Sequence, residues 1–139
     1  MPAVDLLRRV WLQNYWWNNT QLPWCGADNI PPAARFISSP YDLEAHYARK
    51  HTIQWVGYTV HLTETCGENL PHLITHIATT PGPASDGAAT PQIHAAQEQR
   101  GLLPGTYIVD TGFLDADLLV KSRDDYGIDL PGPTRRLRD

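Results

Sequence analysis

The first part of the chain shows helical periodicity and then loses all regularity. Four apolar residues recur at helical spacing and predict an amphipathic helix over residues 3–15: Val4, Leu7, Trp11 and Tyr15. From residue 16 to residue 40 the chain holds prolines, asparagines and aromatic residues without a period, which is typical of an irregular segment. We therefore expect this segment to pack through its aromatic rings rather than as a regular layer.

From residue 52 onward the apolar residues follow period two. Val56, Tyr58, Val60 and Leu62 alternate with small or polar residues, as in a strand with one buried face. This pattern predicts a strand over residues 52–66, a turn at Cys66–Asn69 and a second strand over residues 72–79. The short connection favours an antiparallel hairpin.

The remaining residues alternate between helical and strand signals. Thr90 before Pro91 predicts a helix over residues 91–100, which Gly101 ends. A strand over residues 107–110 ends at Asp110, a helix over residues 115–126 begins at a capping aspartate, and residues 128–130 form a last strand. The order of the elements predicts a mixed α/β fold. We expect an N-terminal region over residues 1–51, a core over residues 52–133 and a basic tail over residues 134–139.

Composition narrows the possible functions. A chain of 139 residues is the size of one domain, and its formal net charge of −4 is not that of a protein that binds DNA by overall charge. Any nucleic-acid contact therefore needs a local basic patch. The sequence shows neither a secretory signal nor an apolar run long enough to cross a membrane, so we expect a cytoplasmic protein with no membrane partner. In that compartment Cys25 and Cys66 are expected to be free thiols.

Four stretches of the chain together carry a family resemblance. They are Ser39-Pro40-Tyr41-Asp42, the strand from Trp55 to Cys66, Pro71-His72-Leu73-Ile74-Thr75-His76, and Val109-Asp110-Thr111-Gly112-Phe113. In this order they resemble bacterial insertion-sequence transposases of the DDE type, and the likeness extends from residue 6 to about residue 133. The resemblance implies a partial RNase H-like fold, in which an antiparallel hairpin and parallel strands form a mixed sheet with flanking helices.

The same resemblance assigns a catalytic role to Asp110. It falls where the family places its second metal-binding aspartate, and the family's first strand and last catalytic helix, with the other two acids, would lie outside this chain. Two magnesium ions in such a centre stabilise the attacking and leaving oxygens of a phosphodiester, and one aspartate cannot hold both ions. We therefore expect a fragment involved in DNA transposition that is inactive alone. Its expected partners are the DNA of the element ends, full-length transposase, or a second copy joined through unpaired strand edges.

Each candidate residue also has a simpler interpretation. Asp110 before Thr111-Gly112 has the composition of a turn aspartate. Arg49 and Lys50 are the candidate DNA-binding residues, as phosphate contacts, but a short charge run is usually a solvated loop. The arginines of the tail allow the same two interpretations.

Two further groups invite a ligand interpretation. Cys66, His72 and His76, with Cys25, contain residues that bind zinc, but two histidines four positions apart on a strand are too far apart to share one ion. The tryptophans in the first part of the chain are suited to stack bases, but their favoured interpretation is packing against a helical region of the parent protein: Trp11, Trp16, Trp17 and Trp24.

Two other classes of function stay open on the sequence alone. The first is an inert module that binds DNA or a transposase. The second is an unrelated small α/β domain that binds a ligand at a strand end.

Overall fold

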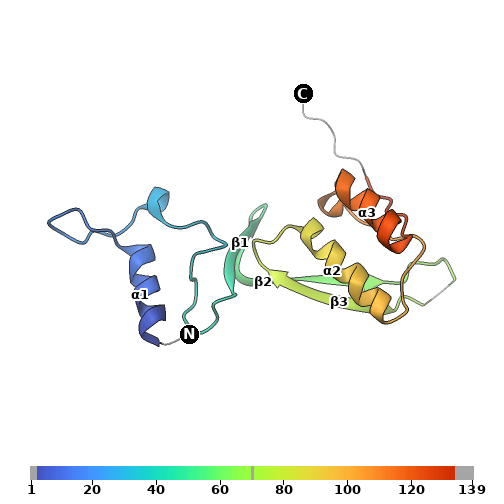
Figure 1. Ribbon diagram of the computed structural model, residues 1–139, viewed down its shortest axis with the longest axis horizontal. Helices are drawn as coiled ribbons and strands as arrows, with labels where there is room; N and C mark the ends of the chain where they lie inside the picture. Colours follow the sequence, from blue (N-terminus) through green and yellow to red (C-terminus); the bar gives the residue numbers. More distant parts are fainter. Residues whose placement is uncertain (1–2, 70, 134–139) are drawn as a thin grey trace, which may run out of the picture. The chain divides into compact units, whose positions relative to one another are not determined.

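The computed structural model describes residues 3–69 and 71–133 (Figure 1). These residues form a mixed α/β fold with three α-helices and one antiparallel sheet of three strands in the order β1-β2-β3. They divide into two compact units, one made of residues 3–59 with 81–83 and the other of residues 60–80 with 84–133. Among the described helices, none is long and apolar enough to cross a membrane.

In the first unit, α1 (Ala3–Asn14) confirms the predicted N-terminal helix. The chain after it is irregular apart from the short 3-10 helix η1 (Ala27–Asn29), and it is held mainly by rings and one buried amide. Tyr15 stacks on Trp11 and meets Trp24 edge to face, with ring centroids 4.8 and 5.0 Å apart. The side chain of Gln13 exchanges two hydrogen bonds of 2.9 Å with the backbone of Ile37, which fixes the segment against the helix.

The strand β1 (His46–Lys50) was not expected from the sequence. It pairs with the first residues of β2 (Ile53–Glu64), from His46 opposite Gly57 to Lys50 opposite Ile53. Arg49 and Lys50 therefore lie in a strand and not in a loop. Only one residue of β1, Ala48, is buried, so the strand lacks the apolar alternation by which a sequence reveals such an element.

A carboxylate organises the turn before β1. Asp42 accepts hydrogen bonds from the backbone N–H groups of Glu44 and Ala45 and from the hydroxyl of Tyr58, the last at 2.8 Å. The bond from Tyr58 lowers the pKa of Asp42, and the same bond raises the pKa of the Tyr58 hydroxyl.

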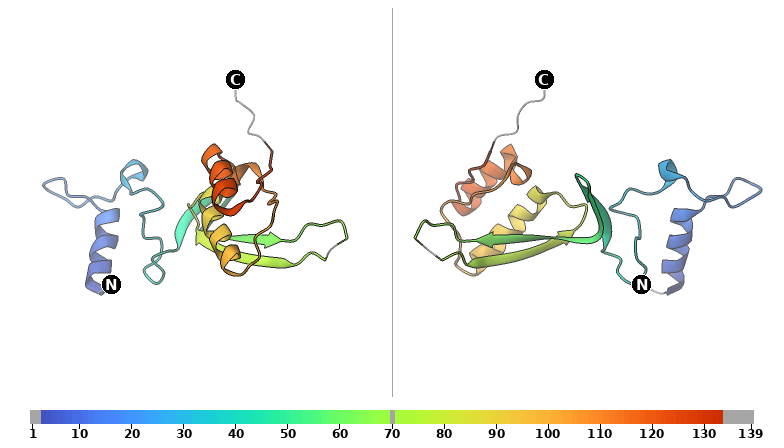
Figure 2. Two further views of the ribbon diagram at one scale, coloured as in Figure 1. Left: turned by 45° about the vertical axis from the view of Figure 1, so that its right-hand side comes forward. Right: turned by 180° about the vertical axis from the view of Figure 1, so that it is seen from behind.

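The predicted hairpin is confirmed as β2 and β3 (Ile74–Pro81). Thr65 closes its far end: its N–H donates to the carbonyl of Leu73, and its hydroxyl bonds both to the Pro71 carbonyl and to the N–H of Leu73. Figure 2 shows α2 (Asp86–Gln99) lying along one face of this hairpin, with α3 (Ala116–Tyr126) next to it.

The start of α2 corrects one prediction. The helix begins at Asp86, so Pro91 lies inside it and Thr90 is not its cap. Ala89 and Thr90 are fully buried together with Ile93, and this packing holds an extra turn that the Pro-Gly-rich composition before it concealed. The predicted end is confirmed, because Gly101 has a φ of 66° and the Leu102 N–H reaches back to the carbonyl of Gln97.

The helix predicted over residues 115–126 is confirmed as α3. The side chain of Asp115 accepts the N–H of Leu118 at 2.8 Å, and Gly127 ends the helix with a φ of 67°.

The strands predicted over residues 107–110 and 128–130 are not strands of the sheet. The two segments run side by side, and a single parallel bridge joins Thr106 to Asp129. The N–H groups of Tyr107 and Val109 donate to the carbonyls of Asp129 and Pro131, at 2.8 and 3.1 Å. The described part of the chain thus has the predicted mixed α/β class, with a sheet that is antiparallel throughout.

Candidate functional site

Asp110 lies at the end of the extended segment that follows Gly105. It is exposed and caps the 3-10 helix η2 (Thr111–Phe113): its Oδ1 accepts the N–H of Gly112 at 2.7 Å. This is the turn role that its neighbours Thr111-Gly112 suggested. The bond fixes the orientation of the carboxyl group and leaves Oδ2 for another partner.

A second carboxylate, which the sequence did not single out, lies beside Asp110. A Cβ atom built on Gly112 would lie 2.8 Å from Asp86 Oδ2 and 3.1 Å from Asp110 Oδ1, so the two carboxylates flank the same glycine. Asp86 is the first residue of α2, and α2 contacts η2. Only a residue without a side chain leaves this space open, and Gly112 supplies it.

Carboxylate oxygens are the ligands that magnesium prefers, and two of them near one point are the start of a binding site. A metal ion held by this chain without DNA or further protein would need at least three carboxylate, histidine or cysteine ligands. No such group of three occurs within residues 3–69 and 71–133. Asp86 and Asp110 can therefore contribute to a cation site but do not form a complete one.

The other candidate residues are dispersed. The Nε of Arg49 donates to the carbonyl of His51 at 3.0 Å; Arg49 and Lys50 are exposed and belong to the first unit, whereas Asp110 belongs to the second. Cys25 is buried and Cys66 exposed, and both thiols are free, as predicted. The four tryptophans before residue 25 are largely exposed, from 49% for Trp11 to 63% for Trp24. The arginines of the tail lie outside the described residues.

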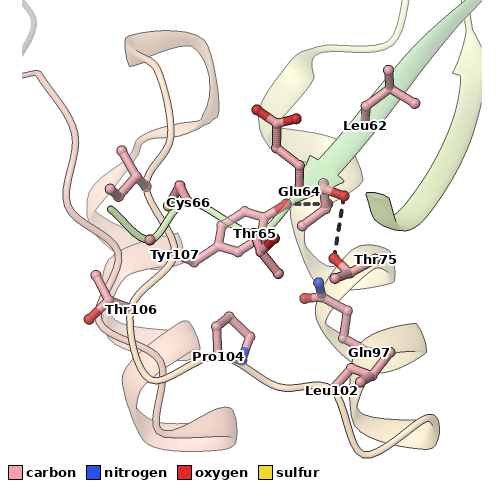
Figure 3. Close-up of a pocket in the computed structure, with 13 residues that line it drawn as sticks. Leu62, Glu64, Thr65, Cys66, Thr75, Gln97, Leu102, Pro104, Thr106 and Tyr107 are labelled. Carbon is pink, nitrogen blue, oxygen red and sulfur yellow. Dashed lines mark hydrogen bonds between the residues drawn. The ribbon is translucent and has the colours of Figure 1, made fainter. Parts of the chain in front are cut away.

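The second unit also has a cavity of about 620 Å³ beside the end of β2 (Figure 3). Tyr107 lies in its wall and its hydroxyl bonds to Thr63 Oγ1 at 2.7 Å. Burial raises the pKa of Tyr107, so the hydroxyl is protonated at neutral pH and serves as a structural link. Gln97, which is only 1% exposed, also lines the cavity.

Sequence reasoning missed Asp86 and Gln97. Asp86 lies beside Gly112 because α2 begins at Asp86, and the composition of the preceding loop gave no sign of that start. A glutamine in an amphipathic helix carries no sign of its burial, so Gln97 had no signal at all.

Comparisons with protein families, with characterised proteins and with solved structures find no match to this chain.

Proposed function

We propose that this chain is part of the catalytic domain of a DDE-type transposase, and that Asp110 is one of the carboxylates that hold magnesium there. The proposal rests on the four stretches of sequence resemblance. One observation supports it above the others: Asp110 ends an extended segment, its Oδ1 is oriented by Gly112, and the carboxylate of Asp86 lies beside it. Two acids around a glycine, Asp110 exposed and Asp86 partly buried, suit a hydrated divalent cation.

The complete centre needs further acids. Magnesium would stabilise the charge that develops on the attacking and leaving oxygens of the phosphodiester. Within the chain, Asp110 would bind the cation. The N–H of Gly112 orients the Asp110 carboxylate, and Asp86 adds negative charge beside that carboxylate. We propose that these residues position one cation without completing the cage, so that the chain alone neither cleaves nor joins DNA.

DNA contact is assigned to the basic residues of β1. Arg49 and Lys50 are adjacent on an exposed strand, where long cationic side chains reach phosphate oxygens without reading bases. The affinity should be weak, in the range of about 10⁻⁴–10⁻⁶ M typical of nonspecific contacts, and it should fall steeply with salt.

Manganese titration followed by amide NMR tests the cation site. Mn²⁺ is paramagnetic, so at submillimolar concentration it should broaden the signals of residues 110–113 and of Asp86 before all others. Asp110→Asn should abolish this selectivity, whereas Asp124→Asn, which removes an exposed carboxylate on α3, should not. Broadening spread evenly over the acidic residues would contradict the proposal.

A plasmid assay tests the activity. Supercoiled DNA with Mg²⁺ or Mn²⁺ should stay intact in the presence of the chain, and nicking that Asp110→Asn removes would show that the chain is active by itself. Duplex binding is measured by fluorescence anisotropy at several salt concentrations. Replacing both Arg49 and Lys50 by glutamine should reduce the slope of the logarithm of the binding constant against the logarithm of the salt concentration by up to about two.

A further inference from the structure

A small cavity in the first unit gathers cationic side chains. It has a volume of about 330 Å³, and two arginines and a histidine line it: Arg9, Arg35 and His46. They come from three separate parts of the unit, namely α1, the irregular segment before residue 40 and the first position of β1. Among the described residues, no acidic side chain lines the cavity. Positive charges that surround one space without a balancing acid attract an anion.

Buried hydrogen bonds hold the two arginines near each other. Arg9 and Gln13 are four positions apart and lie on the same face of α1. The side chain of Gln13 exchanges two hydrogen bonds of 2.9 Å with the backbone of Ile37, and both residues are buried. The helix face that carries Arg9 is therefore fixed against the segment that carries Arg35, two positions before Ile37.

His46 is oriented by the same segment. Its Nδ1 lies 3.1 Å from the carbonyl oxygen of Phe36, which can only accept, so Nδ1 carries the hydrogen and Nε2 is left for another partner. An anion near Nε2 would favour the protonated ring, which donates from both nitrogens. The charge of Asp42 also acts on His46, but Asp42 does not line the cavity and both its oxygens accept hydrogen bonds from Tyr58.

Arg35 supplies an independent sign of a ligand. Its guanidinium group makes neither a hydrogen bond nor an ion pair with any described residue, whereas Arg123 pairs with Asp129 at 2.8 Å. A guanidinium group presents its N–H donors as a planar fork that matches two oxygens of a phosphate or carboxylate. Two such forks at one cavity carry two permanent positive charges, so they favour a doubly charged oxyanion over a singly charged one.

We propose that this cavity binds a phosphate monoester, with the phosphate held by Arg9 and Arg35 and the organic group against the apolar part of the lining. A phosphate monoester carries about −1.5 to −2 charges at pH 7 and has three terminal oxygens. It can therefore bond to both guanidinium forks and still accept a hydrogen bond from Nε2 of His46. The apolar lining consists of Ala34, Ile37 and Leu43.

The same lining disfavours the phosphodiester of a nucleic-acid backbone. A diester has a single negative charge and two terminal oxygens, and its two substituents must both leave the cavity. It therefore satisfies fewer of the three cationic side chains than a monoester does. The inference goes beyond the transposase proposal and does not depend on it, because contact with duplex DNA is assigned there to Arg49 and Lys50, which do not line this cavity.

A titration of the full chain with phenyl phosphate, followed by amide NMR at pH 7, tests the site. The signals of residues 34–37 and of His46 should shift and reach saturation. Arg35→Gln should weaken binding at least about tenfold, and it should fold normally because the guanidinium group contacts no described partner. The matched control is Arg8→Gln, which removes an exposed arginine of α1 that does not line the cavity and should bind as the unaltered chain does.

Two ligand comparisons complete the test. Methyl phenyl phosphate keeps the ring but is a diester, and it should bind at least about tenfold more weakly than phenyl phosphate. A thymidine tetranucleotide with a 5′-phosphate is compared with the same oligonucleotide with a 5′-hydroxyl: a gain from the 5′-phosphate that Arg35→Gln removes would show that the site also takes the monoester of a nucleic-acid end. Equal binding of monoester and diester would refute the proposal. So would equal losses in Arg8→Gln and Arg35→Gln, or the absence of shifts in residues 34–37 and His46 at about 10 mM phenyl phosphate.

Discussion

His94 places a titratable ring in the centre of the second unit, and its removal should change how stability depends on pH. The side chain is 1% exposed and meets the rings of Tyr107 and Tyr126 edge to face, with centroids 5.4 and 5.5 Å apart. Its Nδ1 is 3.5 Å from Ser122 Oγ, a weak hydrogen bond, and its Nε2 has no partner among the described residues. Burial lowers the pKa of His94 below its ordinary value of 6.5, because the charged ring would lose its hydration.

The direction of the effect follows from proton uptake. Below pH 6.5 His94 binds a proton in the unfolded chain but stays neutral in the folded chain. The free energy of unfolding therefore falls as the solution becomes more acidic. The decrease approaches about 1.4 kcal/mol per pH unit and continues until the pH reaches the lowered pKa of the folded state. Above pH 7 both states are neutral at this position and the contribution vanishes.

The substitution His94→Phe keeps an aromatic ring between the two tyrosines and removes both nitrogens. At pH 7.5 it should raise the free energy of unfolding by about 1 kcal/mol, the cost of a buried unpaired nitrogen less the loss of the weak bond to Ser122. Urea denaturation followed by circular dichroism at 222 nm, at pH 7.5, 6.5 and 5.5, measures both effects. The exposed His72→Gln is the control, since it removes a histidine without changing the core.

The result that decides is the pH slope. The unaltered chain and His72→Gln should lose stability between pH 6.5 and 5.5, and His94→Phe should lose up to about 1.4 kcal/mol less over that interval. If His94→Phe loses as much stability between pH 6.5 and 5.5 as the unaltered chain does, the burial of a neutral His94 ring is not the cause of the pH dependence.

Two further substitutions test the packing around the candidate site. Gly132→Ala should destabilise the second unit by about 2–3 kcal/mol in the same denaturation assay, because its Cβ would lie 2.5 Å from the backbone oxygen of Val109. The control is Gly105→Ala, which has open space around it and should change the free energy of unfolding by less than about 0.5 kcal/mol. Asp115→Ala should cost about 1 kcal/mol through loss of the helix cap, and Asp117→Ala, in the first turn but not the cap, less than half of that.

Sequence patterns predicted the elements that local chemistry determines. The helix α3 is set by a capping aspartate at one end and a left-handed glycine at the other, and both signals act within one turn. The hairpin of β2 and β3 follows from alternation over many residues. The first turn of α2 depends instead on tertiary packing, which buries Ala89 and Thr90 of the helix. The strand β1 depends on its pairing with β2, in which Ala48 lies opposite Trp55. No local pattern contains that information.

The candidate site divides in the same way. A sequence motif identified Asp110, and Gly112, two positions later, indicated the turn that Asp110 caps. Its neighbour Asp86 is 24 positions away and reaches it only because α2 and η2 are in contact. The sequence therefore identified one carboxylate of the pair, and the fold identified the other.

The buried side of α2 carries a stripe of polar side chains. Thr90, His94 and Gln97 recur at helical spacing on one side of the helix, all three about 1% exposed, and each has a polar atom without a partner among the described residues. An unpaired buried polar atom costs about 1–3 kcal/mol. His94→Phe removes one of these atoms from the stripe, and for that reason the substitution should stabilise the second unit at neutral pH even though it also removes the weak bond to Ser122.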